Sequence, residues 1–133
     1  MAGTRGYIDP GCVTTRRVSK ESDVYGFGIV AIELACGRKL VNHEAPGDQV
    51  VLVDWVKVLY GRGQAILNAA DQRLGGHFAE QQMKCLLIIG LWCAHSECDR
   101  RPSIREAIKC SILKLHGLFS NLIPPSHHII LQQ

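Results

Sequence analysis

Apolar residues occupy nearly every side of a predicted helix from Val24 to Cys36. Ser22 is a plausible N-cap for it, and Asp23 would then place a carboxylate in the first turn, where the positive end of the helix favours it. A helix that is apolar all round belongs in the centre of a larger body. The glycines at positions 26 and 28 each cost this helix about 1 kcal/mol relative to alanine, which makes sense if another backbone approaches closely there.

Further helices follow from the spacing of apolar and capping residues. Gly37 is a typical helix stop, and Leu40 to Gln49 reads as a loop with a Pro-Gly turn. Ser103 and Glu106 have the spacing of a capping box at the start of the last helix. No stretch alternates convincingly as a strand would, so we expect an all-α protein. Its further helices are predicted at 52–59, 64–71, 81–94 and from 103 to at least 114.

Composition and charge bound the class of protein. The 133 residues are 47% hydrophobic and 20% charged, as in an ordinary globular domain, and the formal net charge is only +3. The basic residues are scattered and are not interleaved with aromatic ones, so we do not expect a nucleic-acid partner. No run reaches the roughly 18 apolar residues of a membrane span, and the N-terminus has no signal-peptide pattern.

Cysteine and histidine give little sign of a metal or catalytic site. The six cysteines fall mostly within apolar helical patterns and form no Cys-x-x-Cys pair, so we expect reduced, mainly buried thiols and no zinc site. His77 and His95 have no evident partners, and we expect both side chains to lie at the surface. No Gly-x-Ser-x-Gly nucleophile motif is present.

Seven short stretches in a fixed order carry a resemblance to a known family. They resemble the cytosolic domain of plant receptor-like serine/threonine kinases, and in particular the L-type lectin receptor-like kinases. The resemblance covers roughly residues 2 to 108. Its stretches are Ala2-Gly3-Thr4, Gly6-Tyr7, Ser19 to Tyr25, Ala35-Cys36-Gly37-Arg38, Leu59 to Gly63, Gly90 to His95 and Arg101 to Arg105.

This resemblance implies part of a protein-kinase C-lobe, with the end of the activation segment followed by the central and last helices. It divides the chain into an activation-segment or substrate-loop remnant at 1–18, a helical C-lobe core at 19–108 and a divergent tail at 109–133. After Ile108 the sequence departs from the family pattern. A shifted reading frame could restore that pattern, so we hypothesise that the tail arose by a frameshift or a mispredicted splice site, the alternative being a divergent last helix.

The resemblance also assigns candidate site residues. Thr4, Gly6, Tyr7 and Pro10 match the loop that positions the substrate hydroxyl, where a threonine favours serine/threonine substrates. The residue that matches Asp23 anchors the catalytic loop in the family by accepting backbone N–H bonds. In this chain those donors are missing, and Asp23 is alternatively a simple helix N-terminal charge.

A departure from the family concerns Arg101. Kinases carry a glutamate at the position of Gly11, after Asp9-Pro10, and it forms a buried ion pair with the arginine that matches Arg101. Breaking such a pair typically costs about 3–5 kcal/mol. Arg101 would then be unpaired unless water or Glu97 reaches it, so we expect either that this copy has relaxed or that Arg101 is exposed.

Phosphoryl transfer needs motifs that the chain lacks. It contains no Gly-rich phosphate loop, Val-Ala-Ile-Lys, His-Arg-Asp or Asp-Phe-Gly sequence, so we predict no catalytic, cofactor-binding or metal-binding residue, although the intact family uses ATP and magnesium. The leading hypothesis is a truncated receptor-like kinase fragment without catalysis. The alternatives are a C-lobe decoy that binds the full-length kinase or its docking partners, and a fragment of a longer active kinase. Intact family members are plasma-membrane receptors with a cytosolic kinase domain, which implies a cytoplasmic location.

Overall fold

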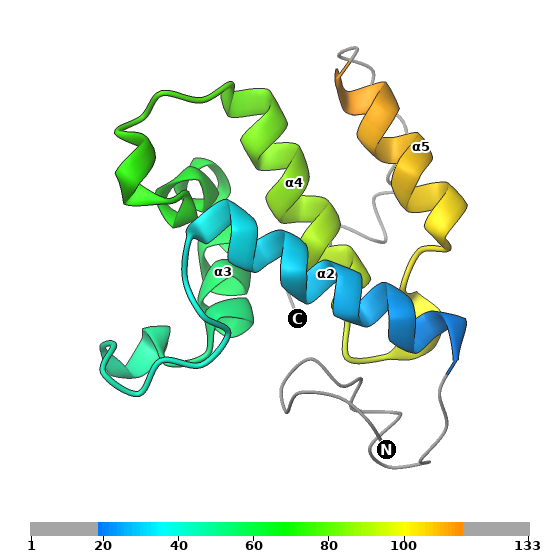
Figure 1. The fold of residues 1–133 in the computed structure, drawn as a ribbon, viewed down its shortest axis with the longest axis horizontal. Coiled ribbons are helices and arrows are strands. Elements are labelled where there is room, and N and C mark those ends of the chain that lie inside the picture. The colour runs from blue at the N-terminus through cyan, green and yellow to red at the C-terminus, as the bar shows by residue number, and fades with distance from the viewer. Residues whose placement is uncertain (1–18, 116–133) are drawn as a thin grey trace.

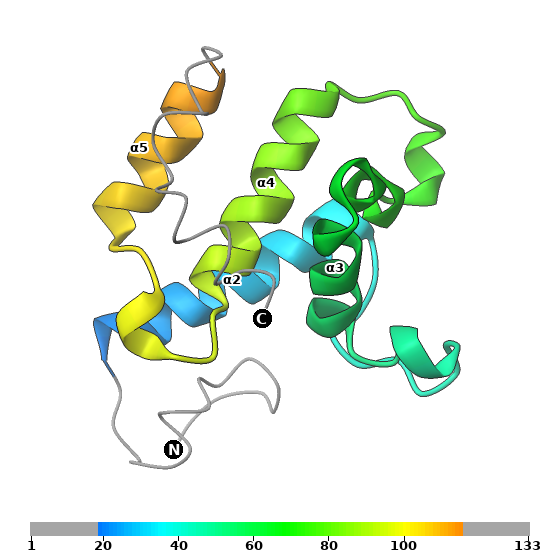
Figure 2. The same cartoon turned by 180° about the vertical axis from the view of Figure 1, so that it is seen from behind.

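The computed structural model describes residues 19–115, except for the side chains at positions 48, 63, 64 and 113–115. Within that range the fold is all-α, as predicted, and the only β-type pairing there is an isolated bridge between Val41 and Val51. Figures 1 and 2 show the arrangement from opposite sides. The α-helices are α2 (Lys20–Cys36), α3 (Leu52–Gly61), α4 (Glu80–Cys93) and α5 (Ile104–Leu115), and the 3-10 turns are η1 (Gly47–Gln49), η2 (Gly63–Ala69), η3 (Gln72–Leu74) and η4 (Cys98–Arg100).

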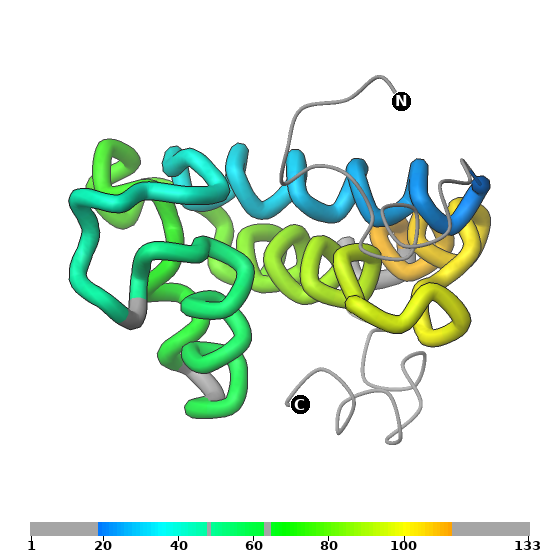
Figure 3. Tube along the Cα trace, turned by 90° about the horizontal axis from the view of Figure 1, so that it is seen from below, coloured from blue at the N-terminus to red at the C-terminus, as the bar shows by residue number. Residues whose placement is uncertain are grey.

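Helix α2 spans the molecule and packs most extensively against α4, beside which it lies in Figure 3. Two glycines permit this close approach. A Cβ on Gly28 would lie 2.6 Å from the carbonyl oxygen of Gly90, and one on Gly90 would lie 2.7 Å from Ile32 Cγ1. The predicted close backbone contact at Gly28 is therefore confirmed, because a side chain at this position would collide with backbone atoms of α4.

The N-terminus of α2 corrects one sequence prediction. The N-cap is Ser19, not Ser22, so the helix begins a full turn earlier than its apolar pattern suggests. Ser19 Oγ accepts a hydrogen bond from Ser22 N at 3.2 Å, and Ser22 Oγ accepts one from Ser19 N at 2.8 Å. Ser22 is thus the second member of a reciprocal capping box. At the other end Gly37 has a φ of 65°, which confirms it as the helix stop.

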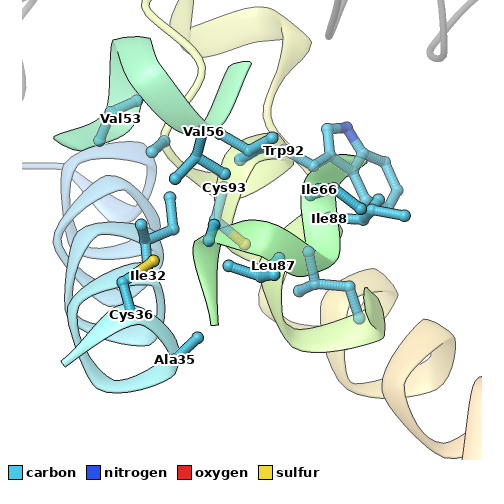
Figure 4. Packing of buried hydrophobic residues seen from close by; sticks show 14 of the residues in the cluster. Ile32, Ala35, Cys36, Val53, Val56, Ile66, Leu87, Ile88, Trp92 and Cys93 are labelled. Atoms are coloured by element: carbon cyan, nitrogen blue, oxygen red, sulfur yellow. The ribbon is translucent and has the colours of Figure 1, made fainter. Parts of the chain in front are cut away.

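The core fills the space between α2, α3, η2 and α4 (Figure 4). As predicted, α3 buries an apolar stripe made by Leu52, Trp55, Val56 and Leu59. The predicted helix at 64–71 is instead the 3-10 turn η2, which places Ile66 in the core with no exposed surface. Leu87 and Cys93 of α4 are equally enclosed, so α4 forms the common wall against which the other elements pack.

Helix α5 stands beside α4 at the opposite end of the molecule from α3 (Figure 1). Its predicted capping box is present: Ser103 Oγ accepts from Glu106 N at 3.1 Å, and a Glu106 carboxylate oxygen accepts from Ser103 N at 3.2 Å. The helix is continuous through Ile108 and Lys109, where the sequence departs from the family pattern. Cys110 is buried, so the residues just after that departure still contribute to the core.

Candidate functional site: the Arg101 anchor and the open face of α2

Arg101 ties the segment between α4 and α5 to the start of α2. Its side chain is 8% exposed. Three backbone carbonyl oxygens accept from its guanidinium: that of His95 from Nε at 2.6 Å, that of Glu21 from Nη1 at 2.9 Å and that of Ser96 from Nη2 at 3.3 Å. Hydrogen bonds from a charged donor are the strong ones in proteins, so this cluster fixes the relative position of two distant stretches of chain.

Tyr25 adds a second attachment to the same guanidinium. The Cζ of Arg101 lies 4.9 Å from the centroid of the Tyr25 ring, which is within the range of a cation–π contact. The expectation that Arg101 is exposed is therefore wrong. Glu97, proposed from the sequence as its carboxylate partner, instead forms an exposed ion pair with Arg100, Oε2 to Nε, at 2.8 Å.

The loop that carries this anchor also corrects the prediction for His95. Its side chain is 6% exposed and its Nδ1 accepts a hydrogen bond from Glu97 N at 3.0 Å. His95 is thus a buried loop-shaping residue and not a surface one. His77 is exposed, as predicted.

An open groove of about 820 Å³ lies next to Arg101, between the first turn of α2 and the beginning of α5. Asp23 lines it from the first turn of α2 and is exposed. The structure therefore places Asp23 where a carboxylate complements a helix N-terminus. Thr4, Gly6, Tyr7 and Pro10, the predicted substrate-loop remnant, lie outside the described residues.

An apolar stripe along α2 is exposed in this structure. Phe27, Val30 and Leu34 are 49%, 45% and 74% exposed, and their spacing of three and four residues places them on one face. Sequence reasoning placed the whole helix at the centre of a larger body and did not distinguish this face. The sequence signal is the breadth of the apolar surface of this helix. A helix with apolar residues on every side has more of them than a single neighbour such as α4 can cover.

The described residues offer few other groups that could bind a metal or react. Among residues 19–115 no group of three or more His, Cys, Asp or Glu side chains could hold a metal ion. Burial raises the pKa of Cys36 and of Cys93 to about 12, so both thiols are inert near neutral pH. No helix within the described part of the chain is both long enough and apolar enough to span a bilayer.

Comparison with known proteins identifies where such an arrangement occurs. L-type lectin-domain containing receptor kinases IX.1 and IX.2 of Arabidopsis thaliana are 46% and 40% identical over 112 and 116 residues, and each alignment includes 82% of this chain. L-type lectin-domain containing receptor kinase S.7 of Oryza sativa subsp. japonica is 40% identical over 108 residues. The chain spans only 17% of the length of the two Arabidopsis relatives and 14% of the rice one.

Among solved structures, the pseudokinase domain of BIR2, an immune regulator of the RLK/Pelle family, superimposes with a TM-score of 0.72 at 31% identity. The superposition includes 86% of this chain but only 34% of that domain. No protein-family model matches the chain. The helical arrangement is therefore that of one part of a plant receptor-like kinase domain.

Proposed function

The chain is homologous to a segment within the kinase region of plant L-type lectin receptor kinases, and from that premise we propose that it acts as a C-lobe scaffold of a receptor-like serine/threonine kinase and has no catalysis of its own. The observation that carries the proposal is the α2–Arg101 assembly. It holds a long apolar helix in a fixed position by contacts with α4, and by hydrogen bonds from Arg101, while leaving Phe27, Val30 and Leu34 exposed.

The sequence supports the lack of independent catalysis. Kinases position nucleotide with a Gly-rich loop and a lysine, hold magnesium with Asp-Phe-Gly and an asparagine, and accept the substrate proton on an aspartate. None of these motifs occurs in the 133 residues. Nearly all the rate enhancement in phosphoryl transfer comes from such positioning and charge stabilisation, so a scaffold without them has nothing with which to accelerate the reaction.

The test compares the chain alone with the chain fused behind the upstream kinase region of a relative such as receptor kinase IX.1. We expect the fusion to bind magnesium-ATP and to phosphorylate a generic protein substrate. We expect the chain alone to give neither binding by fluorescent nucleotide nor radiolabel above a no-protein control. Labelling by the chain alone, retained after contaminating kinases are removed, would show that the proposal is wrong.

The exposed stripe on α2 favours one second candidate, a binding module that docks on a full-length kinase or on its partners. Exposed apolar residues that share one helix face are typical of a helix with a partner on that side. A pull-down between this chain and the kinase domain of a relative tests it. Phe27→Ser with Leu34→Ser should abolish capture, and Val58→Ser, which changes a similarly exposed residue of α3, should not.

We further propose a location on the cytosolic side of the plasma membrane. The relatives are named as receptor kinases, and the matched segment lies in their kinase region. A fluorescent protein fused to the chain, combined with protease protection, would locate it. A signal on the extracellular side would contradict this placement.

A further inference from the structure

The side chain of His95 closes the loop that follows α4. The residue is buried, and its Nδ1 accepts a hydrogen bond from Glu97 N at 3.0 Å. A ring nitrogen that accepts a hydrogen bond carries no proton, so this contact requires a neutral imidazole with its proton on Nε2. The shape of the loop therefore depends on the protonation state of a side chain that titrates near neutral pH.

The same loop supplies two of the acceptors that hold Arg101. The carbonyl oxygen of His95 accepts from Arg101 Nε at 2.6 Å, and that of Ser96 accepts from Nη2 at 3.3 Å. The third acceptor, the carbonyl oxygen of Glu21, lies in the first turn of α2 and is 2.9 Å from Nη1. A change in the loop therefore reaches the first turn of α2 through Arg101.

The charges around the loop do not compensate a positive imidazole in place. The guanidinium of Arg101 is bonded to His95 itself, and the carboxylate of Glu97 is engaged by Arg100 at 2.8 Å. The other charged side chains nearby carry both signs, and all but Lys57 are exposed, so water screens them. They line the adjoining hollows and are Lys20, Glu21 and Asp23 of α2, Asp54 and Lys57 of α3, and Asp99, Arg105 and Glu106 around the start of α5.

We propose that His95 is a pH-sensitive switch: uptake of a proton from water at Nδ1 breaks the hydrogen bond from Glu97 N, opens the loop and loosens the hold of Arg101 on α2. In the protonated ring both nitrogens are donors, so Nδ1–H and the amide N–H of Glu97 would face each other across 3.0 Å and repel. The ring then leaves this position for water. This inference is independent of the proposed scaffold role.

Hydrogen exchange in the full chain measures the switch directly, because the Glu97 amide is the donor to Nδ1. A solvated histidine has a pKa of about 6.5, so if the closed loop excludes the proton, the ratio of closed to open loop falls about tenfold from pH 7.5 to pH 5.5. The protection factor of the Glu97 amide should fall by that factor and the first turn of α2 should follow, whereas α3 should not change. Equal Glu97 protection at the two pH values would overturn the proposal, as would an equal fall throughout α3.

His95→Asn separates the hydrogen bond from the titration. The Oδ1 of asparagine takes the place of Nδ1, accepts from the backbone N–H two residues on and does not titrate. The variant should keep the Glu97 amide protected at pH 7.5 and lose the fall at pH 5.5. The matched control is His77→Asn, which changes an exposed histidine and should keep the tenfold fall of the parent chain.

An unchanged fall in His95→Asn would mean that another group causes it, and the proposal would be wrong. The side-chain resonances of His95 supply a second readout that needs no variant. In the parent chain, their titration followed by NMR should have the same midpoint as the loss of Glu97 protection. Two separate midpoints would overturn the proposal even if His95→Asn failed to fold.

Discussion

The guanidinium of Arg101 donates from Nη1 to the backbone carbonyl oxygen of Glu21 at 2.9 Å, across a sequence separation of 80 residues. The contact attaches the first turn of α2 to the loop that precedes α5. The contact therefore adds a direct link between the start of α2 and the loop before α5 to the packing of both helices on α4.

Replacement of Arg101 by methionine should destabilise the fold strongly. The variant keeps the length of the side chain but leaves the carbonyls of His95, Glu21 and Ser96 without this donor, and hydrogen bonds to charged groups contribute about 1.5–3 kcal/mol each. Because the effects of one side chain do not add, we expect a loss of about 2–4 kcal/mol in the free energy of unfolding, measured by urea denaturation.

The neighbouring Arg100 provides the control for this measurement. Its ion pair with Glu97 is solvent-exposed, with side-chain exposures of 37% and 55%. Such pairs contribute little, so Arg100→Met should change the free energy of unfolding by less than about 0.5 kcal/mol. Equal losses for the two variants would contradict the anchoring role of Arg101.

Gly28→Ala should destabilise the protein although alanine favours helices. The new Cβ would lie 2.6 Å from Gly90 O and 2.7 Å from Ala94 N, and neither backbone atom can move without displacing α4. Overpacking of this kind costs about 1–3 kcal/mol and exceeds the helix-propensity gain of about 1 kcal/mol. Thermal denaturation followed by circular dichroism should show a lower midpoint.

Gly61→Ala is the matched variant, since it also lies in a helix but a Cβ there meets no heavy atom within 4 Å. It should leave the midpoint unchanged or raise it slightly. A Gly28→Ala protein as stable as the parent would mean that α2 and α4 are farther apart than the structure places them.

The sequence was sufficient to predict most of the fold, because its strongest signals are local. Apolar spacing predicted α3 and α4 almost to their ends, and the capping box at Ser103 and Glu106 predicted the start of α5. The start of α2 was misplaced because two serines three residues apart compete as N-caps. Either could cap a helix, and only the reciprocal bonding of Ser19 and Ser22 decides between them.

The contacts of Arg101 with His95, Glu21 and Ser96 could not be predicted, because the acceptors are backbone atoms. Every peptide unit offers a carbonyl, so nothing in the residue type of Glu21, His95 or Ser96 identifies them as partners of Arg101. Reasoning from side chains alone led to Glu97 or to exposure, whereas Glu97 pairs with Arg100 and Arg101 is buried. The predicted substrate-loop residues from Thr4 to Pro10 remain predictions, since they lie outside the described residues.

The ion pair between Asp71 and Arg73 makes the stability of the fold depend on pH in the acid range. The hydrogen bonds that the Arg73 side chain and its backbone N–H donate to the Asp71 carboxylate lower the pKa of that group. A carboxyl group with a lowered pKa in the folded state stabilises the fold above its unfolded pKa of about 3.8, and that stabilisation is lost as the pH falls through the folded value.

Asp71→Asn should therefore reduce the fall in melting temperature between pH 5 and pH 2 relative to the parent chain. The effect should be small, because Arg73 is 80% exposed and water screens the pair. Asp54→Asn, which changes an exposed aspartate of α3, is the charge-matched control. The prediction fails if both variants follow the same acid profile.

The cysteines should differ in their reactivity toward alkylating reagents, because some of the thiols are buried and Cys98 is exposed. Burial raises the pKa of Cys36 and of Cys93 from the ordinary value of 9.0 to about 12 in the fold, whereas Cys98 is exposed. Alkylation requires the thiolate, and at pH 8 a rise in pKa of this size lowers the thiolate fraction by on the order of 10³. Iodoacetamide at pH 8 should therefore label Cys98 before Cys36 and Cys93, which should stay unlabelled until guanidinium unfolds the chain, as measured by peptide mass spectrometry. The same raised pKa values also determine how the stability of the fold changes with pH. Above pH 9 the unfolded thiols lose protons that the folded ones retain, so stability should decline as the pH rises from 9 toward 12. Labelling of Cys93 in the native chain as fast as Cys98 would mean that α4 is not enclosed by α2 and α5, and the packing on which the Arg101 anchor depends would be wrong as well.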